Sequence, residues 1–169
     1  MKNLEKLQPG FSLIEILAVF FVVSMAMVGV VSLIIQNIQA QSINKNNLMA
    51  ASLAQEGIEL VRQTRDSNWR AGRAYDSDLS DGTYMIDYRQ IKPLAVDSSG
   101  AKLYLQNGFY INQTGADAVA TTTIFSRQII IEKQIASIGQ PLQIRSIIAW
   151  TDRQRPYTYE LRTLLYNWK

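Results

Sequence analysis

The hydrophobic pattern of the chain begins with one long uncharged run. Twenty consecutive residues from Ile16 to Ile35 carry no charge, and about 20 apolar residues let one helix cross a bilayer. A single carboxylate, Glu15, stands at the start of the run, behind a polar leader that contains two lysines and ends in Gly10. The pattern predicts a membrane-spanning helix over 11–35. The leader, residues 1–10, then lies in the cytoplasm and the rest of the chain outside.

Helical periodicity continues beyond the apolar run, now with polar positions. Residues 36–47 are rich in Gln, Asn and Ser, and small or apolar residues then recur at steps of three and four, which places them on one helix face. The residues of this stripe are Ala50, Leu53, Ala54, Gly57, Leu60, Val61 and Thr64. Glu59 and Arg62, on the other face, are spaced to pair weakly. We expect an amphipathic continuation of the helix over 36–65 and a connecting loop over 66–82, because turn-forming residues follow Arg65.

The pattern changes to strand-like alternation at residue 83. Asn107-Gly108 supplies the positive φ angles that a type I′ hairpin turn requires. The predicted strands are 83–88, 102–106, 109–112, 121–135, 142–151 and 157–168, with a polar turn over 152–156. Strands separated by turns favour an antiparallel sheet, so we expect an α+β fold. A C-terminal sheet, the head (83–169), would cover the small-residue stripe of the long helix.

The amino-acid composition excludes several classes of catalytic and metal site. Among 169 residues there are 17 Lys+Arg and 14 Asp+Glu, a formal net charge of +3 that is too small and too mixed to indicate nucleic acid by itself. Cysteine and histidine are both absent. Disulfides, Ser–His or Cys–His catalysis and zinc sites built on His or Cys are therefore excluded. No glycine-rich phosphate loop or paired-carboxylate frame is recognisable, so we expect neither an enzyme nor a cofactor.

The first 35 residues resemble the N-terminus of type IV prepilins and the related pseudopilins. The shared pattern is a basic leader, Gly10, Phe11, the residues Ser12-Leu13-Ile14, Glu15 and then the apolar helix. The resemblance implies cleavage between Gly10 and Phe11 by a prepilin peptidase, N-methylation of Phe11 and assembly into a filament. It also implies other pilin subunits and an inner-membrane assembly platform as partners.

Glu15 fits this interpretation physically. A carboxylate at the centre of a membrane helix costs about 2.5–3.5 kcal/mol on insertion scales, so we expect Glu15 to have a cationic partner. Cleavage after Gly10 would create an ammonium group on Phe11, one helical turn from Glu15, and the same group of a neighbouring subunit could pair with it instead. Pairing between subunits would set their axial register, because a shift leaves a charge unpaired in an apolar bundle.

The sequence therefore favours a minor pilin or pseudopilin of a type IV pilus, a type II secretion system or a DNA-uptake filament. We expect a lollipop-shaped, single-pass inner-membrane protein whose head moves to the cell surface or periplasm on assembly. No proline occurs in 11–40, where many major pilins have one, which favours a minor subunit. The main alternative is an adhesin or sensor ectodomain on an ordinary membrane anchor. A secretory signal ending at Ala40 and a membrane-anchored hydrolase are further alternatives.

Two weaker candidate sites lie in or next to the predicted loops. Four aspartates suggest a calcium loop, but an EF-hand requires Gly at its sixth position and Glu at its twelfth, and both positions are Asp here. These candidates are Asp76, Asp78, Asp81 and Asp87. Arg153 and Arg155 lie near two tyrosines and form a small basic patch that could contact DNA. A polar turn is the preferred interpretation of both loops.

Overall fold

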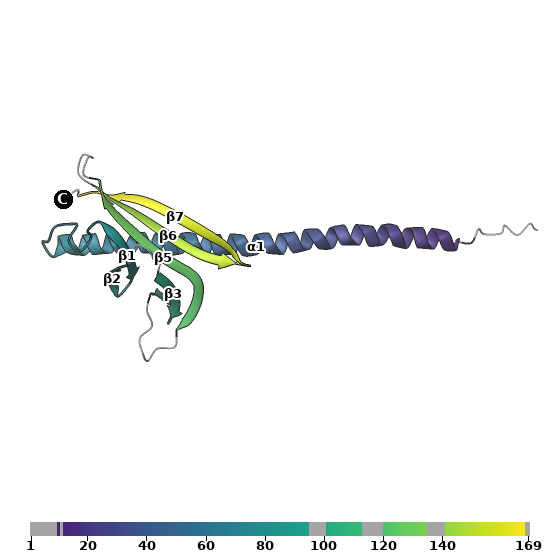
Figure 1. Ribbon diagram of the computed structural model, residues 1–169, viewed down its shortest axis with the longest axis horizontal. Coiled ribbons are helices and arrows are strands. Elements are labelled where there is room, and N and C mark those ends of the chain that lie inside the picture. Colours follow the sequence, from purple (N-terminus) through teal and green to yellow (C-terminus); the bar gives the residue numbers. More distant parts are fainter. Residues whose placement is uncertain (1–9, 11, 95–100, 113–119, 135–140, 168–169) are drawn as a thin grey trace, which may run out of the picture. The chain divides into compact units, whose positions relative to one another are not determined.

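The computed structural model describes residues 10, 12–94, 101–112, 120–134 and 141–167 (Figure 1). The chain divides into two compact units, Met1–Asn44 and Lys45–Lys169, and one helix, α1 (Leu13–Arg70), contributes to both. Seven strands follow it in one antiparallel sheet. The strands are β1 (Gly82–Asp87), β2 (Gln90–Pro93), β3 (Ala101–Gln106), β4 (Phe109–Ile111), β5 (Thr121–Lys133), β6 (Leu142–Asp152) and β7 (Arg155–Leu165). The predicted combination of one long N-terminal helix and an antiparallel sheet is confirmed.

The first unit consists of the apolar part of α1. The most apolar stretch of this helix has a mean hydropathy of 2.7, and none of it is buried. In the described part of the chain, α1 is the one helix long and apolar enough to cross a membrane. The hydroxyls of Ser24 and Ser32 donate to the carbonyls of Phe20 and Val28, at 2.7 and 2.9 Å. Both hydroxyls are thus satisfied within the helix, as apolar surroundings demand.

In the second unit, one face of α1 packs against the sheet. The helix residues buried there are Ala50, Leu53, Ala54, Gly57, Ile58, Val61, Arg65 and Asn68. The predicted stripe is therefore largely confirmed, whereas Leu60 and Thr64 are only half-buried and Ile58 is buried in their place. Buried side chains of β5 and β6, including Ile129, Ile144 and Ile148, complete the core.

Gly57 lies at a close approach of helix and sheet. A Cβ atom at this position would lie 2.9 Å from Ile129 Cδ1, 2.9 Å from Ser146 Oγ and 3.2 Å from Arg127 Cδ. All three neighbours are fully buried, so none can move into open space. The small-residue stripe therefore lets the sheet approach the helix closely, as predicted.

The helix ends at Arg70, five residues beyond the predicted end at residue 65. The turn-forming residues that suggested an earlier end lie inside its last turns. Asn68 is fully buried, and its amide donates to the carbonyls of Tyr75 (3.4 Å) and Ser77. Its own carbonyl accepts from the Arg73 N–H at 2.9 Å. Asn68 thus holds the following loop against the helix instead of ending the helix.

The long strand β5 is the centre of the sheet. On one side its C-terminal part pairs with β1 and its N-terminal part with β3, and on its other side it pairs with β6 along nine residue pairs. β7 pairs with β6 and forms the edge of the sheet. Figure 1 shows β5, β6 and β7 crossing the C-terminal part of α1. The six predicted strands are present, although several begin or end at other residues than predicted. The prediction missed β2, a short edge strand that ends in proline and has too few residues to show alternation.

Two hairpins use two-residue turns with positive φ angles. Asn107 and Gly108 have φ of 50° and 84°, as predicted for a type I′ turn. Arg153 and Gln154 have φ of 48° and 65°. The turn predicted over 152–156 is present but shorter, because Asp152 and Arg155 already pair with each other. The left-handed region costs about 1–2 kcal/mol per non-glycine residue. The eleven residue pairs between β6 and β7 offset this cost, and the pairing extends to the turn.

Replacing Gly57 with leucine tests the close helix–sheet contact. We expect Gly57→Leu to lower the free energy of unfolding by about 3 kcal/mol, because overpacking a filled core costs about 1–3 kcal/mol or more. Urea denaturation followed by circular dichroism measures the change.

Gln55→Leu is the matched control, because Gln55 is exposed on the same helix. It should change the free energy of unfolding by less than about 0.5 kcal/mol. Equal effects of the two substitutions would contradict the packing described for Gly57.

Candidate functional site

The start of α1 carries the carboxylate that the sequence singled out. Gly10 and Glu15 are both exposed. The carbonyl of Ser12, the residue before the helix, accepts from the N–H groups of Glu15 (3.0 Å) and Ile16 (3.3 Å). Ser12 and Glu15 also have the spacing of a helix capping box, in which the acidic residue lies at the positive end of the helix dipole. Phe11 and residues 1–9 lie outside the described residues, so the predicted cleavage and methylation stay predictions.

The four candidate calcium ligands interact with other residues of the chain and do not form one site. Asp76 pairs with Lys133 Nζ at 2.6 Å, and Asp81 accepts from the backbone N–H of Lys133 at 2.7 Å. Asp78 pairs with an arginine of the same loop, Arg73, at 3.2 Å, and Asp87 belongs to the network described below. Within the described residues there is no group of three Asp, Glu, His or Cys side chains that could hold a metal ion.

Arg153 and Arg155 are both exposed at the β6–β7 turn. The neighbouring tyrosines are not free platforms for bases. Tyr157 stacks on Trp150, with 5.5 Å between ring centroids and 12° between ring planes, and Tyr159 packs against the same core cluster. The basic patch therefore consists of two solvent-facing guanidinium groups, and the neighbouring tyrosine rings pack against the hydrophobic core.

A fully buried arginine on β5, Arg127, was not anticipated. It donates to the carbonyl of Leu53 in α1 at 3.2 Å and to the carbonyl of Ile86 in β1 at 2.6 Å. Glu56 approaches it at 3.4 Å. Burial lowers the pKa of Arg127, and the charge and hydrogen bond of Glu56 oppose this effect. Arg127 alternates in phase with the buried side chains of β5, and this signal could have placed it inside.

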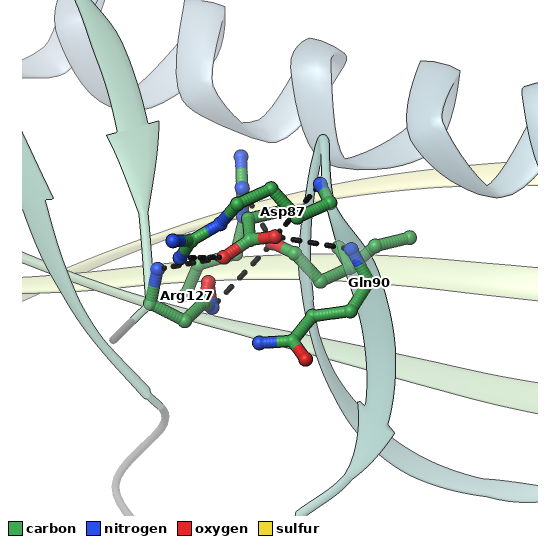
Figure 2. Close-up of polar contacts among 6 residues, drawn as sticks. Asp87, Gln90 and Arg127 are labelled. Atoms are coloured by element: carbon green, nitrogen blue, oxygen red, sulfur yellow. Dashed lines mark hydrogen bonds and ion pairs between the residues drawn. The ribbon is translucent and has the colours of Figure 1, made fainter. Parts of the chain in front are cut away.

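Asp87, at the end of β1, is the second centre of this buried network. Its side chain is fully buried. It accepts from the backbone N–H groups of Arg89 (2.9 Å), Gln90 (3.1 Å) and Asn112 (3.2 Å), as Figure 2 shows for Gln90. The Arg89 guanidinium adds an ion pair at 2.9 Å. The carboxylate thus holds the β1–β2 turn and joins it to the residue that follows β4.

The environment of Asp87 lowers its pKa. Burial by itself raises the pKa, but the hydrogen bonds from Arg89 and Asn112, together with the charge of Arg89, outweigh burial. Because the folded-state pKa lies below the unfolded value, the ionised form stabilises the fold at neutral pH. This stabilisation is complete above the unfolded pKa of about 3.9 and is lost as the pH falls through the folded value.

Asp87→Asn should remove this pH-dependent stabilisation. At pH 7 we expect the substitution to lower the free energy of unfolding by about 1.5–3 kcal/mol, the usual range for hydrogen bonds to a charged group. The difference from the unsubstituted protein should shrink below about pH 4, where the native carboxylate also becomes protonated. Urea denaturation at a series of pH values measures both quantities.

Asp152→Asn is the control, since Asp152 lies at the end of β6, remote in the strand order from this network. A difference between Asp87→Asn and the unsubstituted protein that stays constant from pH 7 to pH 3 would contradict the role of the buried carboxylate.

No protein-family model, curated protein or solved structure matches the chain. Its function is therefore inferred from its own residues and their geometry.

Proposed function

We propose that the chain is a minor pilin or pseudopilin, a non-catalytic subunit of a type IV pilus, a type II secretion system or a DNA-uptake filament. The observation that carries the proposal is one exposed carboxylate, Glu15, in the first turn of a helix whose apolar part is entirely unburied. An ordinary membrane anchor needs the apolar helix but has no use for the carboxylate.

The apolar surface of α1 must be covered by lipid or by other apolar helices. Its large side chains are unusually accessible, with Phe20 at 65%, Phe21 at 68% and Met25 at 70% exposure. Removal of such a surface from water is favourable by about 25 cal/mol per Å². Lipid covers it while the subunit is in the membrane, and neighbouring helices can replace lipid in a filament by close packing. We propose that assembly consists of this exchange.

In this proposal, Glu15 sets the axial register between neighbouring helices. In the proposed filament its carboxylate pairs with the ammonium group of Phe11 that prepilin peptidase creates after Gly10. A carboxylate in an apolar bundle is costly unless it is paired, so only alignments that bring the two charges together are stable. The proposed partners are other pilin subunits, the peptidase that also methylates Phe11, and an inner-membrane assembly platform.

Glu15→Ala tests this role when it is expressed together with the filament system of its host. We expect membrane insertion to be retained, because a charge has been removed from an apolar helix. Incorporation into sheared filaments should fall about 10-fold or more, because an ammonium left unpaired in the bundle costs about 3–5 kcal/mol and each 1.4 kcal/mol is a factor of ten. Immunoblots of the membrane and filament fractions measure both.

Glu59→Ala is the matched control. Glu59 is also a glutamate of α1, but its side chain is 64% exposed and pairs with Arg62 at 2.6 Å, an interaction worth about 0–1 kcal/mol at a surface. Its incorporation should equal that of the unsubstituted protein. Normal incorporation of Glu15→Ala would contradict the proposal and favour an adhesin or sensor ectodomain on a plain anchor.

A further inference from the structure

A polar pocket lies between the last turns of α1 and the β1–β2 hairpin. Its volume is about 270 Å³, and its walls include Gln63, Thr64 and Ser67 from the helix and Tyr88 and Gln90 from the hairpin. This volume is slightly below the range of about 300–1,000 Å³ that is usual for drug-sized ligands. The pocket therefore suits a ligand of about one ring.

The charges around the pocket are paired within the protein. Two arginines line it, and Arg89 bridges to Asp87 at 2.9 Å while Arg73 bridges to Asp78 at 3.2 Å. The Asp87 carboxylate also accepts three backbone N–H groups, so it has little capacity left for a cation. A ligand that carries a charge would compete with one of these pairs for its arginine or carboxylate. The pocket consequently favours a neutral ligand.

Uncharged side chains supply both donors and acceptors. The side-chain amides of Gln63 and Gln90 make no hydrogen bond to the described residues, and Figure 2 draws no interaction between the amide of Gln90 and Asp87. Ser67 Oγ accepts from Arg70 at 3.2 Å and keeps its proton to donate. Thr64 donates to the Leu60 carbonyl at 3.1 Å and can still accept. Such a set matches a ligand whose groups both donate and accept, as hydroxyl groups do.

An exposed aromatic pair stands beside these polar groups. Tyr88 and Phe109 are 56% and 57% exposed, although their ring centroids are only 5.1 Å apart. The two rings come from different hairpins, β1–β2 and β3–β4, and Tyr88 also lines the pocket. An aromatic face packs against weakly polarised C–H groups, and its cost in conformational entropy is low. The ligand thus needs an apolar face as well as hydroxyl groups.

We propose that this pocket binds one sugar unit of a neutral glycan, whose ring face packs on Tyr88 and whose hydroxyl groups bond to Gln63, Gln90 and Ser67. A pyranose combines a C–H face with several neutral groups that each donate and accept. A purely apolar ligand would leave the amides and hydroxyls unpaired, and a charged ligand would compete with the internal ion pairs. The inference concerns the second unit alone and does not rest on filament assembly.

The test uses the full chain in lipid nanodiscs, because sugar-based detergents would compete for the pocket. The probe is a panel of immobilised oligosaccharides with neutral hexose or N-acetylhexosamine ends, together with sialylated and sulfated forms. We expect binding to neutral members of the panel. Gln63→Ala and Gln90→Ala should each weaken it about three- to tenfold, and Tyr88→Ala about tenfold.

Gln55→Ala and Tyr166→Ala are the matched controls, since both residues are exposed and neither lines this pocket. Gln90→Ala retains the backbone N–H that bonds to Asp87, so its urea denaturation midpoint should be unchanged. Retained binding in the controls, with loss in the three pocket variants, supports the proposal. No binding to neutral glycans, a preference for the charged forms, or equal binding by pocket and control variants would overturn it.

Discussion

The fold of the second unit depends on the hydrogen bonds of one buried guanidinium group, that of Arg127. Register pairing between β1 and β5 ends at Tyr84–Ile129, and beyond this point Arg127 donates to the carbonyl of Ile86. The same side chain reaches the Leu53 carbonyl of α1, at a place where Gly57 leaves room for it. Its Nε has no hydrogen-bond partner among the described residues, so the two terminal nitrogens, which bond to these carbonyls and approach Glu56, stabilise this buried charge. Arg127 therefore ties strand, hairpin and helix into one arrangement, and Asp87 extends the connection to Asn112 after β4.

The two units differ in whether their side chains find partners within the protein. The second unit buries its apolar residues and satisfies most of its polar groups internally. In the first unit, the apolar side chains and Glu15 find no partner within the described residues. An apolar helix surface with one carboxylate is stable only in lipid or against other helices, and only if the charge is matched. This difference is the physical reason to propose assembly through the first unit and glycan binding by the second.

Residues whose roles follow from local pattern could be predicted from the sequence. The uncharged run, the Asn107-Gly108 turn and the alternation of the later strands indicated the α+β fold, and Gly57 indicated the close helix–sheet approach. The buried network could not be predicted in the same way, because it joins residues 53, 86 and 127, which are distant in sequence. The end of the helix was predicted too early for a related reason. Asn68 is of a residue type common in turns, but here it lies inside the helix and its side chain bonds to the loop that follows.

The most direct test of the central claim is the intact mass and N-terminal sequence of the protein from its native membrane. A filament subunit of this kind should begin at Phe11 and carry one methyl group on its new N-terminal nitrogen. This result would show that the ammonium group proposed to pair with Glu15 exists. A chain that still begins at Met1 would be a plain anchored protein, and one that begins at Gln41 would be a secreted protein. Either result would contradict the account.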